Sequence, residues 1–270
     1  MQLAINEATT MNASFREDIE AYAAAGFEAV ELWLDKVAAY AEENSLEEAR
    51  SLLGDNGIEA VGACFHAGLM LTEGQDRTDA LEGLKRKLEI CQALGAPSMI
   101  VCPDGPQEDL AARHYDAAAE GLAEAADLAS EYDVSLGIEF IQGHPFVGTA
   151  VTAAEMADKT GRDNVGVLFD TFHFYVGASK VINIQQIADR VLFVHLNDCH
   201  KMPVELAQDS DRTFPGEGMF PLLRILDELK TGGYDGYISL ELFDQDVWEM
   251  EAQEAADLCY EKCRSFMAGV

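Results

Sequence analysis

Residues 165–173 read VGVLFDTFH, an apolar run that stops at an aspartate and carries a histidine three residues further on. Val, Leu and Phe without regular polar alternation are typical of a strand that is buried on both faces, as in a parallel sheet covered by helices. An ionised carboxylate among such neighbours is costly unless it is paired or bound to a cation. The stretch therefore predicts a buried strand with a chemically active end.

The same pattern recurs along the chain, because short β-rich runs alternate with longer amphipathic stretches. Strands are predicted at Gln2–Ile5, Ala29–Trp33, Glu59–Phe65, Ser98–Cys102, Val134–Phe140, Val165–Phe169, Val191–Leu196 and Tyr237–Leu242. Helices are predicted near 14–25, 45–56, 77–94, 109–132, 150–161, 183–189, 219–231 and 249–266. Eight strands, each followed by a helix, predict an α/β fold with a parallel sheet that closes into a (β/α)₈ TIM barrel. We expect a single domain over residues 1–270, since such a barrel needs about 250 residues.

The charge balance excludes some classes of partner. The chain has 49 acidic and 18 basic residues, which give a formal net charge of −31. Such a surface repels nucleic acid and anionic membranes, whose recognition needs clustered Lys and Arg. The acidic residues are spread through predicted helices, as in halophilic proteins that work in concentrated salt, although an acidic protein without that adaptation remains the alternative.

Cysteine usage and hydropathy predict a cytoplasmic protein. The six cysteines form no CxxC pair, and several lie within apolar runs, so we interpret them as reduced core residues. The N-terminus has no basic segment followed by an apolar one, and no apolar run approaches the length of a membrane span.

Four successive predicted strands end with a potential metal ligand: Glu139, Asp170, His195 and Glu241. For any one of these residues, a buried salt bridge is the simpler interpretation. No Lys or Arg lies at these four strand ends, so a divalent cation is the natural charge to balance the set. Three carboxylates and an imidazole suit Mn²⁺, Mg²⁺, Co²⁺ or Zn²⁺ and leave room for substrate oxygens. The sequence therefore predicts one catalytic divalent metal ion.

Several motifs resemble a known family, the xylose-isomerase-like sugar isomerase and epimerase barrels, and within it most resemble the inosose (2-keto-myo-inositol) isomerase subgroup. They are Asn6-Glu7-Ala8-Thr9-Thr10, Gly143-His144-Pro145, Arg162-Asp163-Asn164-Val165-Gly166 with Asp170-Thr171-Phe172-His173-Phe174, the loop 211–218, and Ser239-Leu240-Glu241-Leu242-Phe243. The resemblance implies that Glu139, Asp170, His195 and Glu241 are the metal ligands. It further implies that His173 and Arg212 contact substrate oxygens.

The resulting expectation is a metal-dependent isomerase, an intramolecular oxidoreductase of carbohydrate and inositol metabolism. It would act on a polyol ketone of the inosose type through an enediolate, with Glu139 and Glu241 as the catalytic acid–base groups. His66, at the end of the predicted third strand, is a further candidate for substrate binding. The expected partner is a small sugar or inosose, and the chain could form a homo-oligomer.

Other functions on the same site remain open: a sugar epimerase, a hydroxypyruvate-type isomerase, or a lyase of the 3-dehydroshikimate dehydratase kind. The lyase would need cationic contacts for a substrate carboxylate, and Arg212 is the evident candidate in a loop. A sugar-binding barrel without activity is the alternative from another class, and it would not need a metal. Fold alone cannot decide among these functions.

Overall fold

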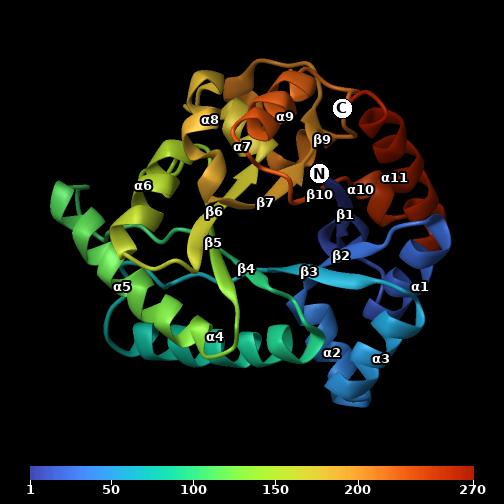
Figure 1. Ribbon diagram of the computed structural model, residues 1–270, viewed down its shortest axis with the longest axis horizontal. Helices are drawn as coiled ribbons and strands as arrows, with labels where there is room; N and C mark the ends of the chain where they lie inside the picture. Colours follow the sequence, from blue (N-terminus) through green and yellow to red (C-terminus); the bar gives the residue numbers. More distant parts are fainter.

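In the computed structural model, which describes residues 1–270, parallel strands form a barrel with helices around the outside (Figure 1). The barrel strands are β1 (Gln2–Asn6), β2 (Ala29–Trp33), β3 (Glu59–Cys64), β4 (Ser98–Val101), β5 (Ser135–Glu139), β6 (Val165–Asp170), β7 (Val191–Leu196) and β10 (Tyr237–Leu240). Their order in the sheet is β3-β2-β1-β10-β7-β6-β5-β4, and neighbouring strands are parallel. The predicted (β/α)₈ barrel is confirmed, with strand boundaries within two residues of those expected.

The two strands at the ends of this order, β3 and β4, meet just beyond the end of β3. His66 forms a parallel bridge with Val101 there. The backbone N–H of His66 donates to the carbonyl oxygen of Ile100 at 2.9 Å, and the N–H of Cys102 donates to that of His66 at 2.8 Å. These bonds close the ring, so the carboxyl ends of all eight strands face one rim.

The helices include three that we did not predict: α2, α7 and α10. The full set is α1 (Phe15–Ala25), α2 (Leu34–Glu43), α3 (Leu46–Asp55), α4 (Gly74–Leu94), α5 (Ala112–Ser130), α6 (Ala150–Thr160), α7 (Thr171–Val176), α8 (Ile184–Ile187), α9 (Leu222–Thr231), α10 (Gln245–Trp248) and α11 (Ala252–Met267). The sequence signal for α2 is weak because the helix follows β2 directly and has no capping side chain at Trp33. Helix α7 is a short turn whose N-cap is Asp170 itself.

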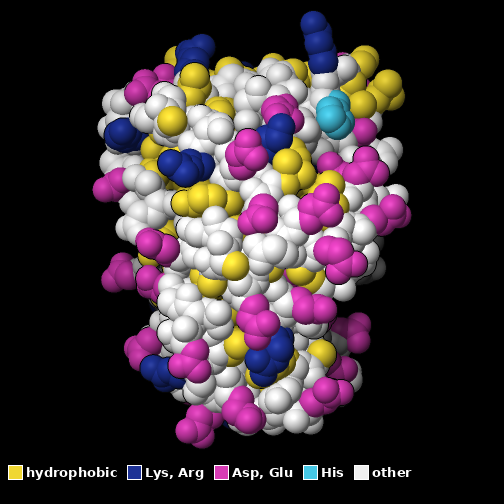
Figure 2. All heavy atoms as spheres, turned by 90° about the vertical axis from the view of Figure 1, so that its right-hand side faces the viewer, with side chains coloured by type: hydrophobic (Ala, Val, Ile, Leu, Met, Phe, Trp, Pro, Cys, Tyr) yellow, Lys and Arg dark blue, Asp and Glu magenta, His cyan; other side chains and the backbone are white.

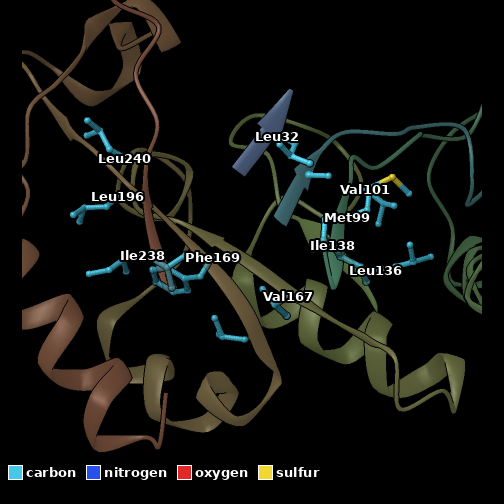
Figure 3. Close-up of a cluster of buried hydrophobic side chains, with 14 of the residues drawn as sticks. Leu32, Met99, Val101, Leu136, Ile138, Val167, Phe169, Leu196, Ile238 and Leu240 are labelled. Carbon is cyan, nitrogen blue, oxygen red and sulfur yellow. The ribbon is translucent and has the colours of Figure 1, made fainter. Parts of the chain in front are cut away.

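Side chains along each strand divide between two apolar layers, since successive residues of a strand point to opposite faces. One set packs under the helices within a cluster of 70 buried residues, and Figure 3 labels ten of these strand residues, among them Ile138, Phe169 and Leu240. The other set fills the barrel interior as a small separate cluster of Ala4, Ala29, Val61, Cys64, Ile100, Leu168 and Phe193. Glu139, Asp170 and Glu241 each follow an outward residue directly, and they therefore point into the barrel.

The outer surface carries the acidic charge, as expected. Figure 2 shows Asp and Glu side chains scattered over the face that includes α1 and α11, with fewer Lys and Arg side chains between them. No helix has the length and apolar character that crossing a membrane requires.

Candidate metal centre

The four predicted ligands converge at the carboxyl ends of their strands. One ligand atom from each of Glu139, Asp170, His195 and Glu241 lies within 4.8 Å of all the others, and all four residues are buried. Nδ1 of His195 lies 3.0 Å from Oε2 of Glu241, 3.6 Å from Oδ2 of Asp170 and 3.6 Å from Oε1 of Glu139. The imidazole nitrogen thus faces all three carboxylates from one side.

The other nitrogen of His195 is held by Glu31, a residue of β2 that we did not predict as part of the site. Nε2 lies 2.9 Å from Oε1 and 3.1 Å from Oε2 of Glu31. Both oxygens can only accept when the carboxyl is ionised, so Nε2 carries the proton in a neutral ring and Nδ1 carries the lone pair. Nδ1 is completely buried and has no hydrogen-bond partner, despite its approach to Glu241. In the neutral ring, this lone pair would be directed at a group of carboxylates, which is the geometry of a metal ligand.

Arg212 requires a correction to the sequence-based expectation that no basic group lies near these carboxylates. Its Nη1 lies 2.7 Å from Oδ2 of Asp170 and 2.7 Å from Oε2 of Glu241, while Nη2 lies 2.8 Å from Oδ1 of Asp209. Arg212 as a whole is 2% exposed. A survey of strand ends could not reveal this partner, because Arg212 comes from a loop 42 residues after Asp170.

The charge balance still favours a cation. Of the buried carboxylates of Glu31, Glu139, Asp170 and Glu241, Arg212 contacts only Asp170 and Glu241, and its guanidinium can neutralise only one charge. Glu139 in particular has no basic nitrogen closer than 3.6 Å. Burial of uncompensated charge on this scale is unfavourable, and a divalent ion coordinated by the four residues would remove much of the cost.

Without such an ion, the carboxylates act strongly on the neighbouring groups. Burial lowers the pKa of His195, but Glu241 and Glu31 outweigh it and raise that pKa well above its ordinary value. Burial raises the pKa of Asp170, but Arg212 and His173 outweigh it and hold that pKa well below the ordinary value. Asp170 is therefore ionised at neutral pH.

A small antiparallel pair of strands, which we did not predict, delivers Arg212 to the site. Strand β8 (Asp198–Cys199) pairs with β9 (Arg212–Thr213) immediately after β7. The buried Asp198 carboxylate accepts the backbone N–H groups of Cys199 and Phe220 at 2.8 Å and of Gly216 at 3.1 Å. These bonds fix both ends of the loop that carries Arg212.

The two histidines proposed for substrate binding lie in different surroundings. His173, on α7, is buried beside the cluster, with Nε2 3.4 Å from Nη2 of Arg212 and 3.9 Å from Oε1 of Glu139. Its Nδ1 has no partner. The ring of His66 is not part of this cluster, because its Nε2 lies 2.8 Å from the carbonyl oxygen of Ala80 on α4.

Three more polar side chains at the site were missing from the predicted set: Asn6, Cys64 and Asn197. Asn6 donates to Oε1 of Glu241 at 3.2 Å, and Asn197 donates to Oδ2 of Asp170 at 3.2 Å. Asn6 and Asn197 occupy strand-end positions like those of the predicted ligands, so the same positional signal could have found them. Cys64 also lies at a strand end, but its apolar neighbours made it resemble a core residue. Glu31 lies in the middle of β2, so attention to strand ends missed it.

These features define an α/β barrel with a candidate metal centre at the carboxyl ends of four neighbouring strands. A family model described as "Xylose isomerase-like TIM barrel" matches residues 19–262. The chain belongs to this family, as its motifs suggested.

Three proteins of known name or structure are similar to this chain. An inosose isomerase from Bacillus velezensis is 28% identical over 260 residues, which cover 94% of this chain and 92% of that protein. A crystal structure of an IOLI protein with a bound zinc atom has a TM-score of 0.92 and 26% identity, and the match covers 99% of this chain and 98% of that one. A 3-dehydroshikimate dehydratase from Pseudomonas aeruginosa is 27% identical over 241 residues, which cover 87% of this chain but 37% of that longer protein.

Proposed function

We propose that this protein is a divalent-metal-dependent isomerase that interconverts inososes, cyclic polyols with one ketone. The observation that carries the proposal is the buried set of three carboxylates around the partnerless Nδ1 of His195. Similarity to inosose isomerase over 94% of the chain supports the substrate class, and the zinc in the IOLI structure supports a metal. Glu139, Asp170, His195 and Glu241 would hold the ion, and their oxygen and nitrogen donors suit zinc, cobalt, manganese or magnesium.

The proposed reaction moves one proton between neighbouring carbons. The carbon that bears the hydroxyl beside the ketone loses its proton, the carbonyl carbon gains one, and the hydroxyl proton passes between the two oxygens. When bound, the divalent ion supplies Lewis-acid stabilisation of the negative charge that develops on these oxygens. The chain itself must supply the base and the acid.

Glu139 and Glu241 are the proposed acid–base pair, and their surroundings differ. Glu241 accepts hydrogen bonds from Arg212 and Asn6, so both of its carboxylate oxygens are already engaged. Glu139 receives only a weak contact from the Cys102 thiol at 3.7 Å. We therefore assign proton removal to Glu139 and proton return to Glu241.

His173 and Arg212 are the proposed substrate-binding groups. His173 lies beside the candidate ligands, with Nε2 3.9 Å from Oε1 of Glu139, and would contact a hydroxyl of a substrate bound there. Three carboxylates contact the guanidinium of Arg212, so its position and orientation are fixed before a substrate binds. Fixed donors of this kind hold a substrate close to its reactive geometry at little cost in ordering.

The test is an assay of the protein purified without chelators, with bound metal measured by elemental analysis. In deuterium oxide with an inosose as substrate, we expect interconversion and incorporation of deuterium at the carbon that receives the proton. Removal of the metal should abolish both, and re-addition should restore them. Absence of bound metal together with absence of inosose conversion would overturn the proposal.

The dehydratase alternative is disfavoured by the position of Arg212. A substrate carboxylate needs an unpaired positive charge, but Asp170, Asp209 and Glu241 already neutralise the guanidinium of Arg212, which leaves it suited to neutral hydroxyl groups. Ketohexoses, hydroxypyruvate and 3-dehydroshikimate belong in the same assay. We expect inososes to show the highest kcat/KM, and a higher value for 3-dehydroshikimate would establish the lyase instead.

A further inference from the structure

Five side chains, two of them the candidate ligands His195 and Glu241, form a closed ring of contacts at the candidate metal centre. Nδ2 of Asn6 lies 3.2 Å from Oε1 of Glu241 and 3.1 Å from Sγ of Cys64. Sγ of Cys64 lies 3.2 Å from Oε1 of Glu31, and the same Oε1 lies 2.9 Å from Nε2 of His195. His195 then returns to Glu241 through Nδ1 at 3.0 Å, which completes the ring. Every member is at most 5% exposed.

We propose that Glu31 and Cys64 are positioning residues that fix the tautomer and orientation of His195 and thereby set the affinity and geometry of the metal centre. The inference rests on the proposed function, because it concerns the same metal site. It adds two residues outside the proposed set of metal ligands and substrate-binding groups.

The carboxylate of Glu31 determines which nitrogen of His195 carries the proton. Both oxygens of Glu31 lie close to Nε2, and neither can donate a hydrogen bond when the group is ionised. The proton is therefore held on Nε2, and the lone pair of Nδ1 is directed at Glu139, Asp170 and Glu241. A carboxylate on the far nitrogen also makes a ligating histidine a stronger donor.

The backbone places Glu31 for this contact. The pairing of β2 with β3 shifts register between Val30 and Glu31, which marks a local irregularity in the strand. Irregularities of this kind re-aim a side chain and are common beside active sites. Glu31 is consequently directed across the barrel toward a residue 164 positions away in the sequence.

Cys64 connects the histidine side of the ring to the carboxylate side. Its thiol donates to Glu31 and accepts from Asn6, and Asn6 in turn donates to Glu241. Two candidate ligands, His195 and Glu241, are thus tied to one network.

Glu31, Cys64 and His195 could alternatively hold an ion of their own, since one donor atom from each lies within 4.8 Å of the others. The hydrogen bonds among them already use these atoms, which favours the positioning role. The two interpretations differ in stoichiometry, because a second ion would bind per chain.

The test compares Glu31→Gln, Cys64→Ala and Cys64→Ser with Cys91→Ala, a control in which a buried thiol on α4 is removed far from the ring. The probe is Co²⁺ added to metal-free protein, read by its visible absorption spectrum, by its dissociation constant in competition with a chelator, and by its stoichiometry. We expect Glu31→Gln to weaken Co²⁺ binding by about 10–100-fold and to change the spectrum at saturation. At saturating metal, kcat should fall while KM for the inosose stays unchanged.

The cysteine variants distinguish loss of the Cys64–Glu31 hydrogen bond from loss of buried packing in general. Cys64→Ala removes the donor and should weaken binding less than Glu31→Gln does, whereas Cys64→Ser restores a donor and should approach the wild type. Cys91→Ala should not change the affinity or the spectrum. If Glu31→Gln fails to fold, the Ala and Ser pair at position 64 carries the test.

Failure of the positioning role can be distinguished from failure of the proposed function. Unchanged affinity and spectrum in both Glu31→Gln and Cys64→Ala would overturn the positioning role and leave the proposed function standing. Two Co²⁺ ions per wild-type chain, falling to one in Cys64→Ala, would overturn it in favour of a second metal site. A wild-type protein that binds no metal and converts no inosose would remove the proposed function, and the positioning role with it.

Discussion

Glu139 and Glu241 lie at the same site, but replacing them should have different effects: both changes should lower kcat, and only the change at Glu241 should also disturb Arg212. Replacing Glu139 with Gln removes the proposed base, and we expect kcat to fall by about 10²–10⁴-fold, the usual contribution of a positioned acid or base. Glu241→Gln should lower kcat similarly and should also disturb Arg212, which donates to Glu241 at 2.7 Å. Steady-state kinetics at saturating metal measure both effects, with the exposed Glu155 on α6 replaced by Gln as the matched control. Near-normal turnover in Glu139→Gln would assign proton removal elsewhere.

Glu7 is a buried carboxyl whose cost to stability should depend on pH. Burial is the largest cause that raises the pKa of Glu7 well above its ordinary value, and the charge of Asp18 is the second. Lys36 opposes this rise. Tyr22 is the other ionisable group of this cluster. The folded chain therefore holds the Glu7 proton more tightly than the unfolded chain does. Stability is lost as the pH rises from the ordinary carboxyl pKa through the raised one.

Replacing Glu7 with Gln should remove that loss. The amide oxygen can still accept the Trp33 N–H, as Oε2 of Glu7 does at 2.7 Å, and its NH₂ can donate to the neighbouring carboxylate of Asp18. We expect Glu7→Gln to raise the free energy of unfolding by about 1–3 kcal/mol at pH 8 and much less at pH 4. Denaturant unfolding at the two pH values measures this difference, and an equal effect at both would contradict the assignment.

At the scale of elements, the barrel strands could be predicted because burial on both faces leaves continuous apolar runs. Strand β6 is buried at every residue, so its sequence left no ambiguity. The predicted ligands could be found for a related reason, since a charged residue at the end of such a run needs a chemical explanation. Elements without these signals were missed: α2 begins without a capping side chain, and β8 and β9 are two residues each. Arg212 and Glu31 escaped prediction as partners because each reaches its contacts across a long stretch of sequence.

The β8–β9 pair should be sensitive to a single methyl group at Gly218. A Cβ at that position would overlap the Asp198 carboxylate and the carbonyl oxygen of Cys199. The loop must then shift, and Arg212 moves with it. We expect Gly218→Ala to raise KM for the substrate and to lower the free energy of unfolding by about 1–3 kcal/mol, which is the cost of losing buried hydrogen bonds.

A matched control for this change lies on α3. Gly54 has no atom within 4 Å of an added Cβ, so Gly54→Ala should stabilise the helix by about 0.5–1 kcal/mol and leave KM unchanged. Thermal unfolding and steady-state kinetics of the two variants measure the contrast. An unaffected KM in Gly218→Ala would show that the loop tolerates the shift without moving Arg212.

At the scale of the whole molecule, the net charge of −31 should make stability depend on salt. Acidic side chains are spread over the surface (Figure 2), and their mutual repulsion acts over about 10 Å at 0.1 M salt but only about 3 Å at 1 M. We expect Tm to rise as KCl increases over this range. A Tm that does not change with KCl would contradict the importance of this repulsion and would weaken the prediction of a halophilic protein.

A double variant tests whether specific surface charges cause this dependence. Glu42 and Glu43 are exposed and lie at the C-terminal end of α2, where the helix dipole already places negative charge. Replacing both with Gln should stabilise the protein at 0.1 M KCl by about 0.3–1 kcal/mol per residue, because each removes an unfavourable charge. The gain should shrink at 1 M KCl, where salt already screens these charges. Thermal unfolding of the variant and the wild type at both salt concentrations measures it, and a gain that is equal at both would show that helix propensity, not charge, is the cause.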